Sequence, residues 1–219
     1  MKKRVRILID IAMTVLMPLL MAYSLIGETF HEIAGTAIFV LFIAHHILNR
    51  KWYTAMPRGR YAAARVFRTV LNLLLLLFMI LQPVSGILMS KHLYTFLPAL
   101  PVAALARSVH MLLAYWGYVL LCVHAGTHLT APMSKLVRKR RTAAIPVFIL
   151  LGGICVYGVA AFVNRGFPDY MLAMTAFAFF DDSEPVVFFI LDYLAIMVTF
   201  MTAGWLVMLA LNIFSAKNR

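Results

Sequence analysis

The chain has 219 residues, of which 63% are hydrophobic and only 13% are charged, and its mean hydropathy is +0.90. A water-soluble domain of this length could not bury so much apolar surface, so the composition excludes a soluble fold and predicts an all-α, polytopic membrane helix bundle. The net charge of +12 does not indicate nucleic-acid binding, because the basic residues stand in short clusters between apolar runs, as in membrane proteins.

Six apolar runs are each close to the roughly 20 residues that a helix needs to cross a membrane. In chain order, we expect transmembrane helices at residues 7–26, 31–49, 66–89, 108–130, 143–163 and 186–213. They predict a single membrane domain over residues 1–219, with a four-helix core at about 7–130 and two further helices at about 143–213. No convincing cleavage site follows the first run, so we expect it to be retained as a helix.

The distribution of charge predicts how these helices are oriented. All but three of the 20 lysines and arginines fall on the side that holds both termini, the exceptions being Lys91, Arg107 and Arg165. Every acid except Asp10 falls on or near the opposite side. By the positive-inside rule, both termini are therefore predicted to be cytoplasmic, in a multi-pass protein of the cytoplasmic membrane.

The three outer connections are expected to differ in structure. The first, around residues 27–29, is very short, so the first two helices should form an antiparallel pair. The second, at about 90–107, contains prolines and is predicted to be ordered but not helical. The third, at 164–185, includes an apolar stretch at 170–177 that is too short to cross and is expected to lie at the interface as a short helix or cap.

Histidines recur at the same interval in the second and fourth runs. His31 and His45 lie fourteen residues apart, and so do His110 and His124. Fourteen helical residues span roughly 21 Å and end about 40° short of four turns, so both rings leave nearly the same face. Because the two helices run parallel, His31 should face His110 near the outer surface, and His45 should face His124 near the inner one. Two pairs of imidazoles at two depths predict two b-type haems, each with bis-histidine ligation.

Two neighbouring histidines leave the inner pair open. His46 points about 100° away from His45, and His128 lies one turn beyond His124 on nearly the same face. Either is an alternative ligand, or a partner for a propionate, a quinone or a proton path, although the matched depth favours His45 with His124. In the second outer loop, His92 is expected to be solvated or interfacial rather than part of the outer haem site.

Haem propionates need cations or hydrogen-bond donors. Near the outer site Arg107 and Lys91 are available, and near the inner site Arg65 and Arg68 are available. We take Arg68 and Arg107 as the candidate cofactor-binding cations, while topology alone explains most of the other arginines.

Small, acidic and cysteine residues complete the set of candidates. Glycines on the histidine-bearing helices leave room either for a flat macrocycle or for close helix packing, namely Gly35, Gly117 and Gly126. Glu28 and Glu32, one turn apart beside His31, are candidate proton groups. The outer acids Asp181, Asp182 and Glu184 are expected to form a solvated loop end, with partner docking or proton acceptance as the alternatives. Cys122 and Cys155 fall inside apolar runs and are predicted to be core residues.

Several of these strings resemble the flavinylation-associated cytochrome family of bacterial membrane proteins. The resemblance is carried by Tyr23 to Glu28, His31-Glu32, Gly35, the string from His45 to Tyr53, His110 to Gly117, His124 with His128, Asp169-Tyr170 and Phe177 to Asp181. The placing of ligands on the second and fourth helices is also loosely similar to the cytochrome b of quinol-oxidising bc complexes. The family resemblance implies a di-haem cytochrome b of the bacterial inner membrane that works with quinones and associates with flavinylated proteins on the outer face.

Together these features predict a membrane electron carrier between a quinone pool and an outer-face redox partner, with quinone or quinol as substrate. One alternative is a histidine-dependent, proton-coupled transporter, which should have broken helices or repeated halves around a midplane site. Another is a structural membrane anchor for a soluble redox enzyme, which leaves the repeated histidine interval unexplained.

Overall fold

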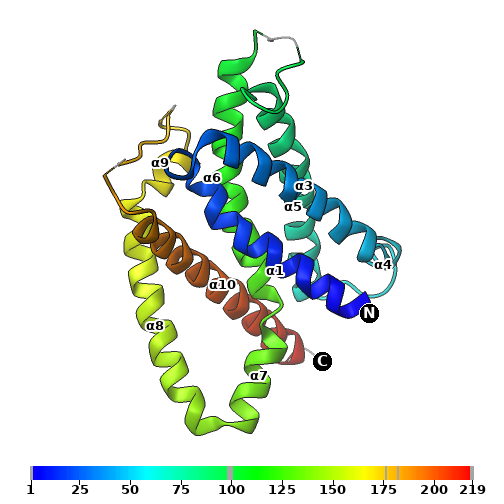
Figure 1. The fold of residues 1–219 in the computed structure, drawn as a ribbon. Coiled ribbons are helices and arrows are strands. Elements are labelled where there is room, and N and C mark those ends of the chain that lie inside the picture. Colours follow the sequence, from blue (N-terminus) through cyan, green and yellow to red (C-terminus); the bar gives the residue numbers. More distant parts are fainter. Residues whose placement is uncertain (1, 98–100, 176, 182, 218–219) are drawn as a thin grey trace. The chain divides into compact units, whose positions relative to one another are not determined.

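A computed structural model describes residues 2–97, 101–175, 177–181 and 183–217, and helices are the regular secondary structure found in these ranges (Figure 1). Among the described residues, five helices are long and apolar enough to cross a membrane: α3 (Glu28–Leu48), α5 (Ala63–Leu88), α6 (Ala103–Thr127), α8 (Arg141–Asn164) and α10 (Val186–Lys217). The protein is therefore an all-helical, multi-pass membrane protein. Asp182 of the predicted acidic cluster lies outside the described residues.

The first predicted crossing corresponds to helix α1 (Lys2–Met21), which begins and ends about five residues earlier than the expected 7–26. Its charged residues include Arg4, Arg6 and Asp10, so its composition does not match that of the five apolar helices. The chain leaves the helix at Ala22, and the four-residue helix α2 (Tyr23–Ile26) follows. Six crossings thus remain a prediction.

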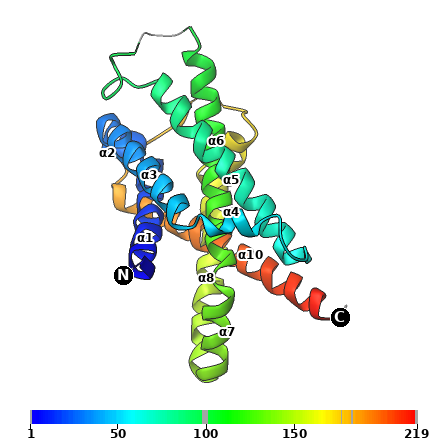
Figure 2. The same ribbon diagram turned by 90° about the vertical axis from the view of Figure 1, so that its right-hand side faces the viewer.

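Gly27 forms the turn between α2 and α3. Its backbone has φ +94° and ψ 141°, a conformation that is essentially reserved for glycine because residues with a Cβ are strained at positive φ. The turn brings α1 and α3 side by side in both views of the ribbon (Figures 1 and 2). Three hydrogen bonds join the two helices, from Arg6 Nη2 to Leu48 O at 2.7 Å, from His45 Nδ1 to Asp10 Oδ1 at 2.8 Å, and from His31 Nδ1 to Leu20 O at 2.9 Å. Because the residue number rises along one helix as it falls along the other, the pair is antiparallel, as the short loop predicted.

The chain forms two compact units. The first comprises residues 1–59, 76–115 and 169–190, and the second comprises residues 60–75, 116–168 and 191–219. His31 and His110 both belong to the first unit. His45 belongs to the first unit and His124 to the second.

In the second unit, α10 packs on α6 and α8 through close backbone contacts. A Cβ placed on Gly204 would lie 2.2 Å from the carbonyl oxygen of Val123, and one on Gly158 would lie 2.5 Å from that of Ala195. Such small residues let membrane helices approach closely. Next to these contacts, Tyr118 is fully buried and donates its hydroxyl hydrogen bond to the backbone carbonyl of Tyr193 at 2.7 Å.

Besides α2, the described residues form three further short helices between the long ones: α4 (Lys51–Ala55), α7 (Thr130–Lys139) and α9 (Phe167–Met171). For the stretch at 170–177, a cap at the interface stays a prediction. A helix there is wrong, because among its described residues only Tyr170 and Met171 are helical, at the end of α9. The end of α9 is a Schellman motif: Ala173 adopts φ +54°, Met174 N bonds to Asp169 O at 2.8 Å, and Ala173 N bonds to Tyr170 O at 3.2 Å. The second outer loop is shorter than the expected 90–107, since α6 begins at Ala103.

Candidate functional site

The structure brings two of the predicted ligands, His31 of α3 and His110 of α6, together within the first unit. Their ring centres lie 6.1 Å apart and the ring planes meet at 66°. When an imidazole binds a metal, the nitrogen is about 2.0 Å from it and the ring centre is about 1.1 Å farther away, so two opposite imidazoles have centres about 6 Å apart. The distance between the two ring centres is therefore the one expected if His31 and His110 were to bind the same metal ion.

The end of α1 fixes the orientation of His31. Helix α1 stops at Met21, so the carbonyl groups of its last turn have no partner within the helix. The Leu20 carbonyl accepts a hydrogen bond from Nδ1 of His31 at 2.9 Å, and the Tyr23 ring packs at a right angle to the same imidazole with ring centres 5.1 Å apart. A carbonyl oxygen can only accept, so Nδ1 carries the proton and Nε2 keeps its lone pair for a metal.

The end of α5 holds His110 in a similar way. Nδ1 of His110 lies 3.2 Å from the carbonyl oxygen of Gln82 and 3.1 Å from the hydroxyl oxygen of Ser85, a buried residue. A Cβ on Gly86 would lie 3.2 Å from Cε1 of the ring, so a larger residue there would make the imidazole shift by a few tenths of an ångström. Nothing in the sequence marks Ser85 or Gly86 as a neighbour of His110, whereas Gln82 is recognisable as a polar residue inside an apolar run.

The side chain of Gln82 also touches the other nitrogen of His110. Its Nε2 lies 3.1 Å from Nε2 of His110, while its Oε1 is buried with no hydrogen-bond partner among the described residues. For His110 to bind iron, this amide must rotate away from the ring. The rotation would break one hydrogen bond of the amide, from its Nε2 to His110, because its Oε1 has no partner among the described residues.

At the other end of α3, two adjacent histidines have different partners. His45 donates from Nδ1 to the carboxylate of Asp10 at 2.8 Å. His46 contacts the hydroxyl oxygen of Tyr53 through Nδ1 at 2.6 Å, and its ring centre lies 4.3 Å from that of Phe42. Burial raises the pKa of the Tyr53 hydroxyl, so that group is protonated at neutral pH and is able to donate to His46. His45 thus has a carboxylate as the partner of its Nδ1, whereas His46 has a tyrosine hydroxyl.

In the second unit, His124 and His128 are likewise distinguished by their surroundings. Nδ1 of His124 lies 2.9 Å from Oδ1 of Asn72 on α5. His128 falls just beyond the last residue of α6 and is exposed, with its ring centre 5.0 Å from that of His124. The pairing of His45 with His124 stays a prediction.

A common hydrogen-bonding pattern links the four preferred histidines. Each places Nδ1 against an acceptor oxygen, and the four pairs are His31 with Leu20 O, His45 with Asp10 Oδ1, His110 with Gln82 O, and His124 with Asn72 Oδ1. Histidines that bind metals through Nε2 almost always donate the other N–H to a carbonyl or carboxylate, which fixes the tautomer and the orientation of the ring.

Comparisons with models of known protein families, with curated proteins and with solved structures found no match for this chain. The described residues also contain no group of three or more His, Cys, Asp or Glu side chains that could hold a metal ion. A haem iron needs only two axial side chains from the protein, because the porphyrin supplies the other four nitrogens. Two histidines facing one another are therefore enough to hold such a group.

The predicted cations have their own partners or lie at the surface. The guanidinium of Arg107 lies 5.4 Å from the centre of the Phe177 ring, and that of Arg65 lies 4.3 Å from the centre of the Tyr61 ring. Lys91 pairs with Glu28 at 3.1 Å, and Arg68 is exposed near the start of α5. Binding of propionates by Arg68 or Arg107 stays a prediction.

One of the three predicted glycines, Gly126, serves close helix packing. A Cβ on Gly126 would lie 2.0 Å from the carbonyl oxygen of Met201 on α10, so this glycine is needed for close approach of two backbones. A Cβ on Gly35 would meet Leu20 of α1 at 3.9 Å, which is an ordinary contact. The structure therefore favours close packing for Gly126, and both interpretations stay open for Gly35 and Gly117.

Proposed function

We propose that this chain is a membrane di-haem cytochrome b that passes electrons between a quinone pool and a redox partner on the outer face. The observation that carries the proposal is the outer histidine pair. His31 and His110 stand 6.1 Å apart between ring centres, and each places Nδ1 against an acceptor oxygen. Bound haem would supply reversible one-electron chemistry at its iron, with a potential set by the ligands, burial and nearby charge.

In this proposal, α1 orients the histidines at both ends of α3. The Leu20 carbonyl holds His31, and the Asp10 carboxylate holds His45. A carboxylate on the second nitrogen raises the basicity of an imidazole and strengthens its bond to a metal. His46 has a tyrosine hydroxyl in the equivalent place, so we assign the inner ligand on α3 to His45.

The second inner ligand is assigned to His124 for a similar reason. Its Nδ1 contacts an amide oxygen of Asn72, and it lies within α6, whereas His128 lies just beyond the end of that helix. With α1 counted as a crossing beside α3, the chain would span the membrane six times and keep both termini in the cytoplasm. A bacterial inner membrane, a quinone substrate and a flavinylated partner on the outer face follow from the family resemblance.

The five long helices favour an electron carrier over a transporter. Each of them runs without interruption across its described length. Transporters with midplane sites typically use broken helices whose ends bind the substrate.

Counting haem in the purified protein tests the proposal directly. In detergent, the reduced-minus-oxidised spectrum should show b-type haem, and the pyridine haemochrome assay should give two haems per chain. The variant His92→Ala serves as a control for the haem count. His92 is not one of the four proposed ligands, since it lies in the loop after α5, where its Nε2 is 3.5 Å from the Glu28 carboxylate. A folded but colourless protein, expressed with an adequate haem supply, would contradict the proposal and favour the transporter or the anchor.

A further inference from the structure

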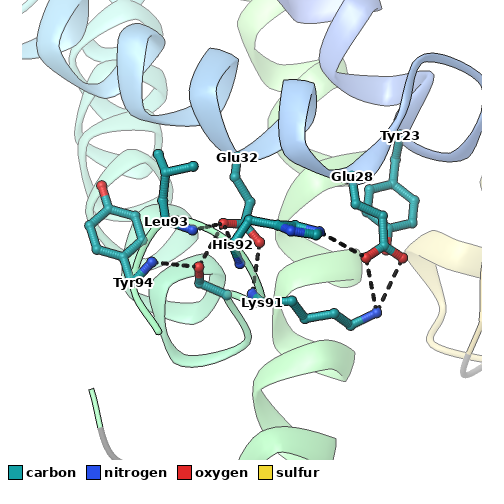
Figure 3. Close-up of polar contacts among 8 residues, drawn as sticks. Tyr23, Glu28, Glu32, Lys91, His92, Leu93 and Tyr94 are labelled. Atoms are coloured by element: carbon teal, nitrogen blue, oxygen red, sulfur yellow. Dashed lines mark hydrogen bonds and ion pairs between the residues drawn. The ribbon is translucent and has the colours of Figure 1, made fainter. Parts of the chain in front are cut away.

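The carboxylate of Glu32 anchors the loop that follows α5. It accepts hydrogen bonds from Ser90 Oγ at 2.6 Å, from Lys91 N at 2.8 Å, from His92 N at 3.3 Å and from Leu93 N at 2.8 Å (Figure 3). Three successive backbone N–H groups thus converge on one side chain, as in the backbone nests that bind anions. Hydrogen bonds to an ionised acceptor are stronger than those between neutral groups, so this contact fixes the loop firmly on α3.

Other residues on the same face of α3 extend the contact. Glu28 and Thr36 lie one turn before and one turn after Glu32. Glu28 accepts from Lys91 Nζ at 3.1 Å, and Thr36 Oγ1 lies 3.0 Å from the hydroxyl oxygen of Tyr94 (Figure 3 shows the Glu28 contact). The central contact, from Glu32 to the loop backbone, does not depend on which side chains the loop carries at positions 91–93.

This anchor connects the supports of the two outer histidines. Glu32 follows His31 directly on α3. The anchored loop follows the last turns of α5, where Gln82 and Ser85 hold Nδ1 of His110. We propose that Glu32 is a positioning residue for the outer pair. By holding the loop on α3, Glu32 sets the distance and orientation of the His31 ring relative to the His110 ring. The inference rests on the proposed function only for its effect on haem.

A hydrogen-exchange experiment on the full chain in detergent tests the anchor without reference to haem. In Glu32→Asp the carboxylate keeps its charge but is one methylene too short, and in Glu32→Gln an amide N–H₂ would face the backbone donors. We expect exchange of the amides at positions 91–93 to become at least about tenfold faster in both variants. Glu28→Gln is the matched control, because Glu28 reaches the loop only through side chains, and it should leave these amides protected. Unchanged exchange in both Glu32 variants would overturn the anchor.

Redox titration of the same variants tests the positioning role. Glu32→Asp preserves the charge near the outer site, so a shift of one midpoint potential, with the other unchanged, would report altered ligand geometry rather than lost charge. The low-spin electron paramagnetic resonance signal of the same haem should shift as well. Faster amide exchange with both potentials and both signals unchanged would overturn the positioning role. A protein without haem would contradict the proposed function, while the exchange result would still decide whether Glu32 anchors the loop.

Discussion

The imidazole of His45 donates its Nδ1 hydrogen bond to the carboxylate of Asp10, with 2.8 Å between the two atoms. Asp10 is the one acid that the charge pattern leaves away from the outer side, and its pairing with His45 gives it a role. A carboxylate only accepts, so Nδ1 of His45 carries the proton of this bond, and Nε2 is the nitrogen that a metal would use. An acid within α1 is thereby connected to the candidate inner ligand on α3.

Replacing Asp10 by Asn should weaken the inner haem site. Loss of the group that accepts a hydrogen bond from a metal-binding histidine typically lowers metal affinity or activity by about 10–100-fold. We therefore expect a lower haem content or a shifted midpoint potential for one haem. Absorbance spectra and a redox titration measure both quantities. The exposed loop acid Asp181 provides the control, and Asp181→Asn should match the wild type. Identical potentials and haem content in Asp10→Asn and wild type would rule out this role.

Single replacements of the outer pair should each remove one haem. His31→Ala and His110→Ala should reduce the pyridine haemochrome count from about two per chain to about one, because a haem with one axial histidine is held less tightly. The double variant should also retain about one haem, since both residues serve the same site. If the double variant lost two haems while each single variant lost one, the two residues could not be ligands of one iron.

The inner ligand on α3 can be decided by comparing His45→Ala with His46→Ala. We expect the first to lose one haem, because its Nδ1 bonds to a carboxylate, and the second to keep both, because its Nδ1 contacts the hydroxyl of Tyr53. The haemochrome count again provides the measurement. The reverse result would assign the ligand to His46.

Gln82→Leu should strengthen the outer site. The substitution removes the amide that lies 3.1 Å from Nε2 of His110 and the buried oxygen that has no partner in the described part of the chain. The backbone carbonyl of Gln82 stays in place to hold Nδ1. Slower loss of the outer haem to apomyoglobin, relative to wild type, is the expected result. Faster loss would indicate that the amide supports the bound haem.

Gly204→Ala should destabilise the second unit. The added Cβ would lie 2.2 Å from the carbonyl oxygen of Val123, and overpacking of this kind costs about 1–3 kcal/mol. Gly152→Ala is the matched control, since its Cβ would meet no described atom within 4 Å, and the gain in helix propensity of up to about 1 kcal/mol applies to both. Thermal unfolding in detergent should show a lower Tm for Gly204→Ala only. Equal Tm values for the two variants would contradict the close packing of α6 and α10.

Sequence alone predicted the helical class, the antiparallel pair at the start, and the positions of the five apolar helices to within about five residues. These features depend on local composition, since about 20 apolar residues in a row must form a helix that crosses the membrane. The sequence also shows that His31 and His45 are separated by the same interval as His110 and His124. Helical periodicity then places the two histidines of each helix on nearly the same face.

The tertiary structure decided which groups surround each histidine. Nothing local indicates that Leu20 accepts from His31, or that Asn72 meets His124, since each contact joins two segments that only folding brings together. The interpretation of Gly126 needed the same information, because room for a macrocycle and close packing against Met201 favour the same residue type in the sequence. Periodicity determines which face of a helix a residue occupies, while the packing of neighbouring helices determines what that face meets.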